Sequence, residues 1–144
     1  MPIIVVKDIM KTDVITVEPE LSLSQAAKIL MTYRIGTLPV VEKGKLVGIF
    51  TNSDMNKCVS NNCNAFETKV RDVMTKKVLT VTPKTTVTEA AQLMTKYGIK
   101  KLPVVESGRL VGIVTVSDIL VVEPSLINAV GKMVSFDPEN NVAG

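Results

Sequence analysis

The fold is decided by Leu38-Pro-Val-Val-Glu-Lys-Gly-Lys-Leu-Val-Gly-Ile49, a stretch that the chain contains twice. The second copy reads Leu102-Pro-Val-Val-Glu-Ser-Gly-Arg-Leu-Val-Gly-Ile113. In both copies two short apolar runs flank a polar segment with a glycine, which predicts a β-hairpin. The proline falls at the entry to the first strand, where a missing N–H group is tolerated.

The duplication extends well beyond the hairpin. A shift of 64 residues places Val6–Met55 on Val70–Ile119 without a gap, and 24 of the 50 positions are identical. Two segments this similar are expected to share one fold. Each is too small to bury a good core alone. We therefore expect a pseudo-two-fold intramolecular dimer: repeat 1 with its linker over residues 1–64, repeat 2 over 65–122, and a C-terminal tail over 123–144.

Strands and helices follow the same order in both repeats. A β-branched run comes first, at Val14–Val17 and again at Val78–Val81. A helix follows, for which Ser22-x-x-Gln25 and Thr86-x-x-Glu89 predict capping boxes. The hairpin and a second helix complete the unit. The sequence therefore predicts a mixed α/β (α+β) fold of two β-α-β-β-α repeats, with a further short helix over Ser125–Val134 in the tail.

One face of each first helix is apolar. Its residues recur at helical spacing: Ala26, Ala27, Leu30 and Met31 in repeat 1, and Ala90, Ala91 and Met94 in repeat 2. Exposed apolar patches usually mark interfaces between proteins. We expect these faces to join two copies of the chain in a homodimer with closed two-fold symmetry, the commonest assembly.

Composition excludes several classes of function. The 144 residues include no His and no Trp, which excludes Ser-His-Asp catalysis and metal sites that need imidazole. Nothing supplies an activated nucleophile or a tuned acid–base pair, so we expect neither an enzyme nor a metal protein. A net charge of +3 and few aromatic residues also argue against a nucleic-acid binder, although the pI of 8.9 permits one.

Two further features bear on location. The most apolar stretch, Leu110–Val122, is broken by Ser117-Asp118 and falls short of the ~18 apolar residues that a membrane span needs. The N-terminus lacks the basic region and cleavage site of a signal peptide. We therefore expect a cytoplasmic protein with no membrane partner, in which Cys58 and Cys63 are reduced thiols. A redox switch formed by this pair is the less favoured alternative.

A repeated motif lies where a strand meets a helix. It reads Gly48-Ile-Phe-Thr51-Asn-Ser-Asp54 in repeat 1 and Gly112-Ile-Val-Thr115-Val-Ser-Asp118 in repeat 2. A helix N-terminus and a hydroxyl can donate to phosphate, and a carboxylate can accept from both hydroxyls of a ribose. The glycine would keep the backbone accessible. Thr-x-x-Asp is also a plain helix cap, so the residues alone leave both interpretations open.

The ordered set of motifs resembles the cystathionine β-synthase (CBS) domain. In repeat 1 the set comprises Asp8-Ile-Met10, Val14–Val17, Ala26-Ala27, Ile35–Val41 and Gly48–Asp54, and repeat 2 matches equally well. The tandem pair, often called a Bateman module, covers about Val6–Leu120. The resemblance implies two clefts between the repeats that bind adenosine compounds, mainly AMP, ADP or ATP and less often S-adenosylmethionine.

The resemblance also implies which residues line these clefts, with the Asp of each motif at the ribose and the Thr at the phosphate. One cleft would join Thr51, Asp54, Leu79, Ile99, Lys100 and Lys101. The other would join Thr115, Asp118, Ile15, Ile35, Gly36 and Thr37. Two methionines would lie near the cleft mouths, namely Met10 and Met74.

The two clefts differ in charge. Lys100 and Lys101 belong to one, whereas Gly36 and Thr37 occupy the matching places of the other. Cations attract phosphate, so we expect the cleft with the lysines to prefer a phosphorylated nucleotide. The alternative is that these lysines form a solvated face.

Together these inferences predict a regulatory sensor without catalysis. Binding of an adenine nucleotide would change the shape or assembly of the module, and a protein partner that the sequence does not identify would respond to the change. Two alternatives stay open. One is a module for S-adenosylmethionine-type nucleosides, which the lysines disfavour because that ligand is cationic and has no phosphate. The other is a structural dimerisation module without a ligand.

Overall fold

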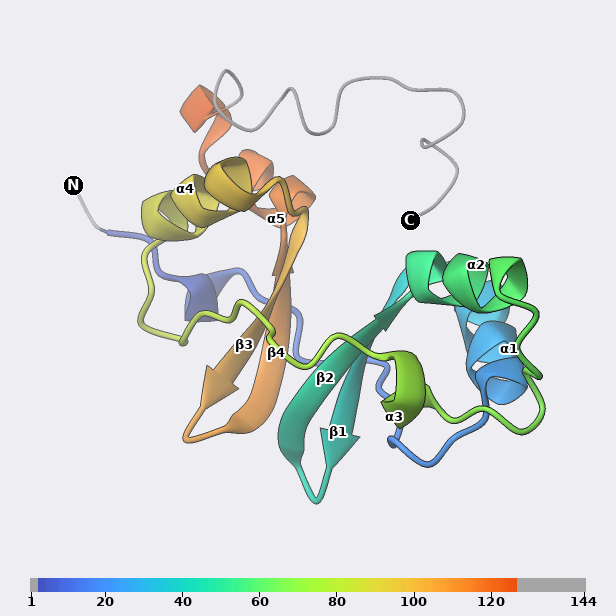
Figure 1. The fold of residues 1–144 in the computed structure, drawn as a ribbon. Helices are drawn as coiled ribbons and strands as arrows, with labels where there is room; N and C mark the ends of the chain where they lie inside the picture. The colour runs from blue at the N-terminus through green and yellow to red at the C-terminus, as the bar shows by residue number, and fades with distance from the viewer. Residues whose placement is uncertain (1–2, 127–144) are drawn as a thin grey trace. The chain divides into compact units, whose positions relative to one another are not determined.

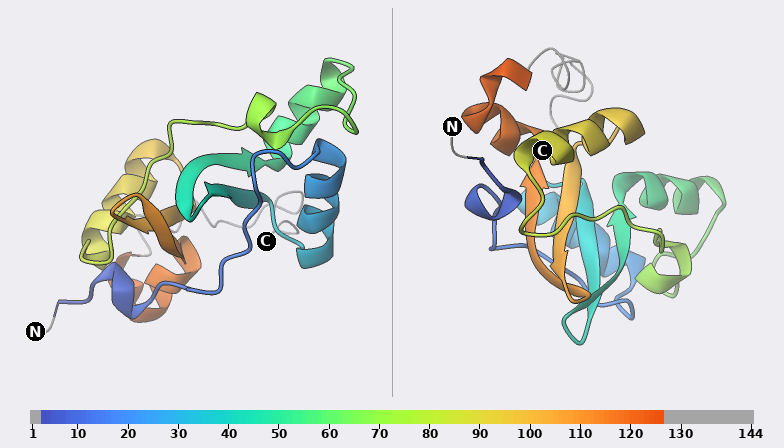
Figure 2. Two further views of the ribbon diagram at one scale, coloured as in Figure 1. Left: turned by 90° about the horizontal axis from the view of Figure 1, so that it is seen from below. Right: turned by 90° about the vertical axis from the view of Figure 1, so that its left-hand side faces the viewer.

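The computed structural model of the chain describes residues 3–126, which form two compact units. The continuous unit consists of residues 15–78, and the split unit consists of residues 3–14 together with residues 79–126. In Figures 1 and 2 the N-terminal segment, in blue, lies beside the orange strand of the split unit. Among the described helices, none combines the length and the apolar character needed to cross a membrane.

The continuous unit contains one antiparallel hairpin and three helices. Its elements are α1 (Leu23–Tyr33), β1 (Thr37–Glu42), β2 (Lys45–Thr51), α2 (Asn52–Ser60) and α3 (Val70–Val73). The strands pair from Thr37 opposite Thr51 to Glu42 opposite Lys45. The predicted hairpin is confirmed.

The split unit repeats this order and begins with a segment from the N-terminus. Its elements are η1 (Val6–Asp8), α4 (Val87–Tyr97), β3 (Lys101–Glu106), β4 (Arg109–Thr115), α5 (Val116–Val122) and η2 (Pro124–Leu126). The hairpin has the matching register, from Lys101 opposite Thr115 to Glu106 opposite Arg109. The mixed α/β fold and its duplication are confirmed. The helix predicted over Ser125–Val134 lies mostly outside the described residues.

Both first helices begin at the predicted caps. At α1, Ser22 Oγ accepts from Gln25 N at 3.2 Å and Gln25 Oε1 accepts from Ser22 N at 3.3 Å, a complete capping box. At α4, Thr86 Oγ1 accepts from Glu89 N at 3.0 Å, the hydroxyl half of such a box. These bonds satisfy N–H groups that have no partner inside the helix.

The β-branched runs that precede these helices differ from the prediction. Each forms one isolated parallel bridge instead of a strand, Val17 with Val40 and Val81 with Val104. Val17 N donates to Pro39 O at 3.1 Å, and Val41 N donates to Val17 O at 2.9 Å. Glu18-Pro19 follows at once, and proline has no N–H group with which to continue a ladder.

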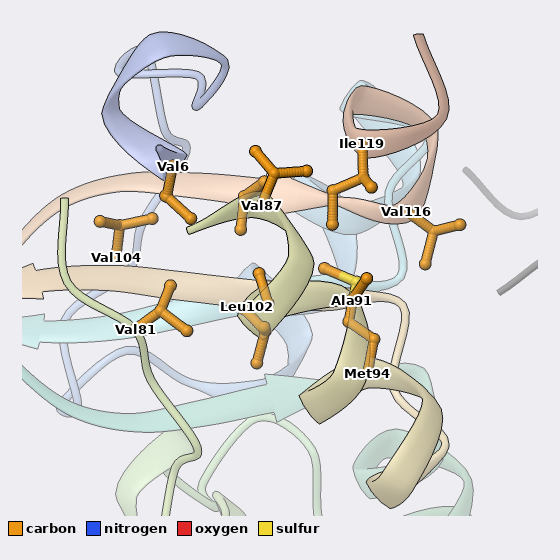
Figure 3. Packing of buried hydrophobic residues seen from close by; sticks show 11 residues of the cluster. Val6, Val81, Val87, Ala91, Met94, Leu102, Val104, Val116 and Ile119 are labelled. Carbon is orange, nitrogen blue, oxygen red and sulfur yellow. The ribbon is translucent and has the colours of Figure 1, made fainter. Parts of the chain in front are cut away.

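Each unit has its own hydrophobic core. In the split unit, α4 buries Ala90, Ala91 and Met94 against Leu102 of β3, and Figure 3 shows side chains of α4, α5, η1 and β3 gathered together. In the continuous unit, the core includes Leu23, Ala26, Leu30, Leu38 and Phe50. The apolar helix faces that we expected to join two chains are therefore largely used inside the units. Met31, which is 79% exposed, is the exception in α1.

The spatial units cross the boundaries of the linear repeats. Lys11 and Ile113 exchange two backbone hydrogen bonds of 2.9 Å, which tie the N-terminal segment to repeat 2. Thr75 and Ile49 exchange two bonds of the same length, which tie the segment after the linker to repeat 1. Each hairpin therefore pairs with the opening segment of the other repeat.

Cys58 and Cys63 are joined by a disulfide in the structure, with their Cα atoms 5.1 Å apart. That separation lies within the usual range for bridged cysteines. The expectation of two reduced thiols therefore does not describe this structure.

Candidate functional site

The fourteen predicted site residues divide equally between the two units. The split unit holds Met10, Leu79, Ile99, Lys100, Lys101, Thr115 and Asp118. The continuous unit holds Ile15, Ile35, Gly36, Thr37, Thr51, Asp54 and Met74. The two groups that the resemblance implies each take residues from both units, and they stay predictions.

In the continuous unit, Thr51 and Asp54 form a complete capping box at the start of α2. Asp54 Oδ2 accepts from Thr51 N at 2.9 Å and from Thr51 Oγ1 at 3.2 Å, and Thr51 Oγ1 accepts from Asp54 N at 3.3 Å. Asp54 is 7% exposed. Among residues 3–126 it is the one charged residue that is buried. The helix-cap interpretation of the motif is therefore confirmed, and it leaves the ligand interpretation open because one carboxylate has several acceptor positions.

In the split unit, the same box opens α5. Asp118 Oδ2 accepts from Thr115 N at 3.0 Å, and Thr115 Oγ1 accepts from Asp118 N at 3.2 Å. The second carboxylate oxygen, Oδ1, lies 3.7 Å from Lys11 Nζ. The Lys11 side chain is 66% exposed, whereas that of Asp118 is 14% exposed. The Lys11 ammonium group therefore lies on the solvent-exposed side of the Asp118 carboxylate.

The hairpin register places the first residue of β1 and of β3 opposite the threonine of the motif. Thr37 lies opposite Thr51, and Lys101 lies opposite Thr115. Gly36 O accepts from Asn52 N at 3.1 Å in one unit. In the other, Lys100 O accepts from Val116 N at 2.9 Å. Within the split unit, the two lysines are thus neighbours of the Thr115–Asp118 motif.

The split unit has an excess of positive charge at its motif. Burial, and secondarily the positive charge of Lys11, lowers the pKa of the Lys101 ammonium below its usual value. The matching positions of the continuous unit carry Thr37 and Thr75, which are neutral. Sequence reasoning missed Lys11, whose only signal was its place directly after Met10.

The glycines of the two motifs accommodate a methionine and its neighbour. A Cβ on Gly112 would come within 2.7 Å of Met10 Sδ and 2.9 Å of the Lys11 carbonyl oxygen. On Gly48 it would come within 2.6 Å of Met74 Sδ. The expectation that these glycines leave the backbone open was wrong, because the methionine segments already fill the space.

The remaining predicted residues are apolar and partly buried. Leu79 and Ile99 pack against the core of the split unit, and Ile15 and Ile35 pack against that of the continuous unit. Among residues 3–126, no group of three or more Cys, Asp and Glu side chains is arranged to hold a metal ion.

Comparison with known proteins identifies both repeats. The CBS domain model matches residues 6–61 and 70–124. The CBS domain-containing protein YhcV of Bacillus subtilis is 33% identical over 135 residues, which cover 94% of this chain and 96% of that protein. Curated relatives named inosine-5'-monophosphate dehydrogenase match over only 20–22% of their own length.

Two solved structures of similar proteins contain nucleosides or nucleotides. The CBS domain pair of protein MJ0100, in complex with 5'-methylthioadenosine and S-adenosyl-L-methionine, is 39% identical with a TM-score of 0.74, and covers 86% of this chain and 98% of that one. CBSX2 in complex with AMP is 27% identical with a TM-score of 0.73, and covers 85% and 98%. The chain therefore belongs to the CBS domain family and carries two copies of the domain.

Proposed function

We propose that the chain is a regulatory module that binds an adenine nucleotide, AMP, ADP or ATP, and catalyses no reaction of its own. Membership of the CBS family supports a regulatory role. The AMP complex of CBSX2 supports the ligand class, since that protein is similar over most of its length. We further propose that the module works in the cytoplasm, the compartment that holds the adenine nucleotide pool.

The observation that carries the proposal is the cluster of cations around one capping box. Lys11 Nζ lies 3.7 Å from Asp118, and Lys101 lies opposite Thr115 in the hairpin register. A carboxylate can accept from ribose hydroxyls while ammonium groups and the Thr115 hydroxyl face a phosphate. The split-unit motif therefore suits a phosphorylated nucleoside. The continuous-unit motif, which has Thr37 and Thr75 in place of the two lysines, should discriminate less between nucleotide and nucleoside.

Binding would act through a shift between conformations. A ligand favours the state to which it binds more tightly, and it can shift the equilibrium only by that difference in affinity. A partner protein that distinguishes the two states would then respond to the nucleotide. This mechanism needs no chemical step on the ligand.

The test replaces Lys101 by threonine, the residue at the matching position of the continuous unit. Calorimetric titration should show AMP affinity reduced about fivefold, because one unit charge near a phosphate is worth about 1 kcal/mol or more. Adenosine affinity should change less than about twofold, since adenosine has no phosphate. Lys84→Thr, an exposed lysine elsewhere in the split unit, should leave both affinities unchanged. Equal losses for the two ligands would contradict the proposal.

A second ligand class is S-adenosylmethionine or 5'-methylthioadenosine. The 39% identity with the MJ0100 domain pair, solved with both compounds, supports it. The sulfonium of S-adenosylmethionine would be repelled by Lys11 and Lys101. If this class were right, Lys101→Thr would strengthen S-adenosylmethionine binding and wild-type protein would bind it more tightly than AMP.

We also propose that the chain forms a homodimer. Support comes from apolar side chains that the units leave exposed at the ends of α1 and α4, since Met31 is 79%, Tyr33 56% and Tyr97 55% exposed. Light scattering at micromolar concentration should give about twice the chain mass of 15.6 kDa. A Tyr33→Ser/Tyr97→Ser variant should shift the measured mass towards that of one chain. A wild-type mass near 15.6 kDa would refute the dimer.

A further inference from the structure

The disulfide lies at the end of α2, in the core of the continuous unit. Cys58 is 4% exposed and belongs to the core cluster, and Cys63 packs against that cluster while partly exposed. Cys63 N donates to Cys58 O at 3.0 Å, so the backbone turn also brings the two residues together. The turn therefore holds the cysteines in place for repeated closing of the bond.

The bridge joins α2 to the segment that holds the start of α1. Two residues after Cys63, Ala65 O accepts from Ser24 N at 2.9 Å. Three residues further on, Thr68 O accepts from Leu23 N at 3.0 Å. Loss of the bridge would therefore remove a covalent link between the end of one helix and the support of another.

The same helix carries the candidate site at its other end. Asp54 and Cys58 are four residues apart, which places them on one face of α2, and both are buried. The helix has only 9 residues, and helices this short depend on tertiary contacts for their stability. A cross-link at Cys58 is thus one turn away from the carboxylate that pairs with Thr51.

The second repeat offers an internal comparison. The position that matches Cys58 is Val122, and both cysteines of the chain lie in repeat 1. The helix α5 begins with the same Thr-x-x-Asp box but carries no cysteine. Any effect of thiol chemistry should therefore be confined to the continuous unit.

We propose that Cys58 and Cys63 form a reversible dithiol–disulfide switch that sets the stability of α2 and, through it, the nucleotide affinity of the continuous-unit motif. The part that concerns affinity rests on the proposed function. In a compartment with a thiol buffer, a disulfide of this kind is typically transient and redox-sensing. Cys63 is the more exposed of the two, so we expect its thiolate to react first with the oxidant.

The oxidant is a low-molecular-weight disulfide. The Cys63 thiolate attacks one sulfur of that disulfide, which forms a mixed disulfide and releases one thiol. The Cys58 thiolate then attacks the Cys63 sulfur, closes the protein bridge and releases the second thiol. Two electrons pass from the cysteine pair to the oxidant, and the two protons end on the released thiols. An excess of an external dithiol reverses both steps.

The first experiment compares full-length protein treated with glutathione disulfide and with dithiothreitol. Reduction should lower Tm by about 5 °C, because it removes a cross-link over a short loop. Backbone hydrogen exchange over residues 52–60 should become about tenfold faster, while exchange over residues 116–122 stays unchanged. Cys63→Ser, which keeps the buried Cys58 in place, should behave like the reduced protein under both conditions. Exchange that is the same in both redox states would overturn the proposal.

The second experiment measures AMP binding by calorimetry in an Asp118→Ala background, which removes the motif of the split unit. Reduction should weaken binding about fivefold, and Cys63→Ser should abolish the dependence on redox state. Faster exchange with unchanged AMP affinity would overturn the link to the site and leave a purely structural bridge. If AMP bound in neither state, the proposed function would fail, while the exchange measurement would still decide whether the switch exists.

Discussion

Replacing Asp118 by alanine should weaken AMP binding to the split-unit motif roughly ten- to hundredfold, and Asp54→Ala should do the same at the continuous-unit motif. The loss of a charge-assisted hydrogen bond to a ribose hydroxyl costs about 1.5–3 kcal/mol, which corresponds to that range of affinity. Calorimetry of each single variant should show one site weakened by that factor and the other unchanged. In the double variant both sites should be weakened.

The capping role of these carboxylates must be separated from their role in binding. Each accepts from the backbone N–H of its threonine, Asp54 at 2.9 Å and Asp118 at 3.0 Å, so each variant should also lose about 1 kcal/mol of folding stability. Gln25→Ala is the matched control, because it removes the same half of the capping box at α1. That variant should lose stability and bind AMP normally. If Asp118→Ala behaved in the same way, the carboxylate would be a helix cap and nothing more.

Gly112→Ala should be the most destabilising of the small substitutions in the split unit. The added Cβ would lie 2.9 Å from the Lys11 carbonyl oxygen, a backbone atom held by the bonds between Lys11 and Ile113. Met10 can move its side chain away, but the Lys11 backbone cannot move without breaking that pairing. Overpacking of this kind costs about 2 kcal/mol, or roughly 4–8 °C in Tm.

Thermal unfolding of Gly112→Ala and of a control variant would check this expectation. Gly108 lies in the hairpin turn with φ 78° and has open space around its Cβ position. Asparagine adopts that backbone conformation more readily than most residues, so Gly108→Asn should cost about 1 kcal/mol, less than the loss at Gly112. An equal loss in both variants would show that the close approach of the N-terminal segment does not limit packing at Gly112.

Local features of the fold could be predicted because local signals determine them. The alternation around the two turns specified both hairpins, and the Thr-x-x-Asp and Ser-x-x-Gln patterns specified where α1, α2 and α5 begin. These signals depend on residues within a few positions of each other. The Val14–Val17 run was less well predicted, because β-branched residues indicate an extended chain but not how many bridges it makes.

The exchange of segments between repeats could not be predicted in the same way. Val6-Lys-Asp-Ile-Met10 and Val70-Arg-Asp-Val-Met74 are nearly the same sequence, so either could dock on either hairpin. Which one docks depends on the path of the connecting chain, a long-range property that no short motif encodes. The same limit explains why Lys11 was missed, since its contact with Asp118 spans most of the described chain.

The split unit is built from two segments that lie far apart in the chain, and this affects the order in which the two units can fold during synthesis. Residues 15–78 precede β3 and β4 along the chain, so the continuous unit can fold before the split unit is complete. Lys11 is translated early, yet its partner Ile113 follows about a hundred residues later. At about 5–20 residues per second, the N-terminal segment waits some seconds with its apolar side chains uncovered, a period in which a chaperone could bind it.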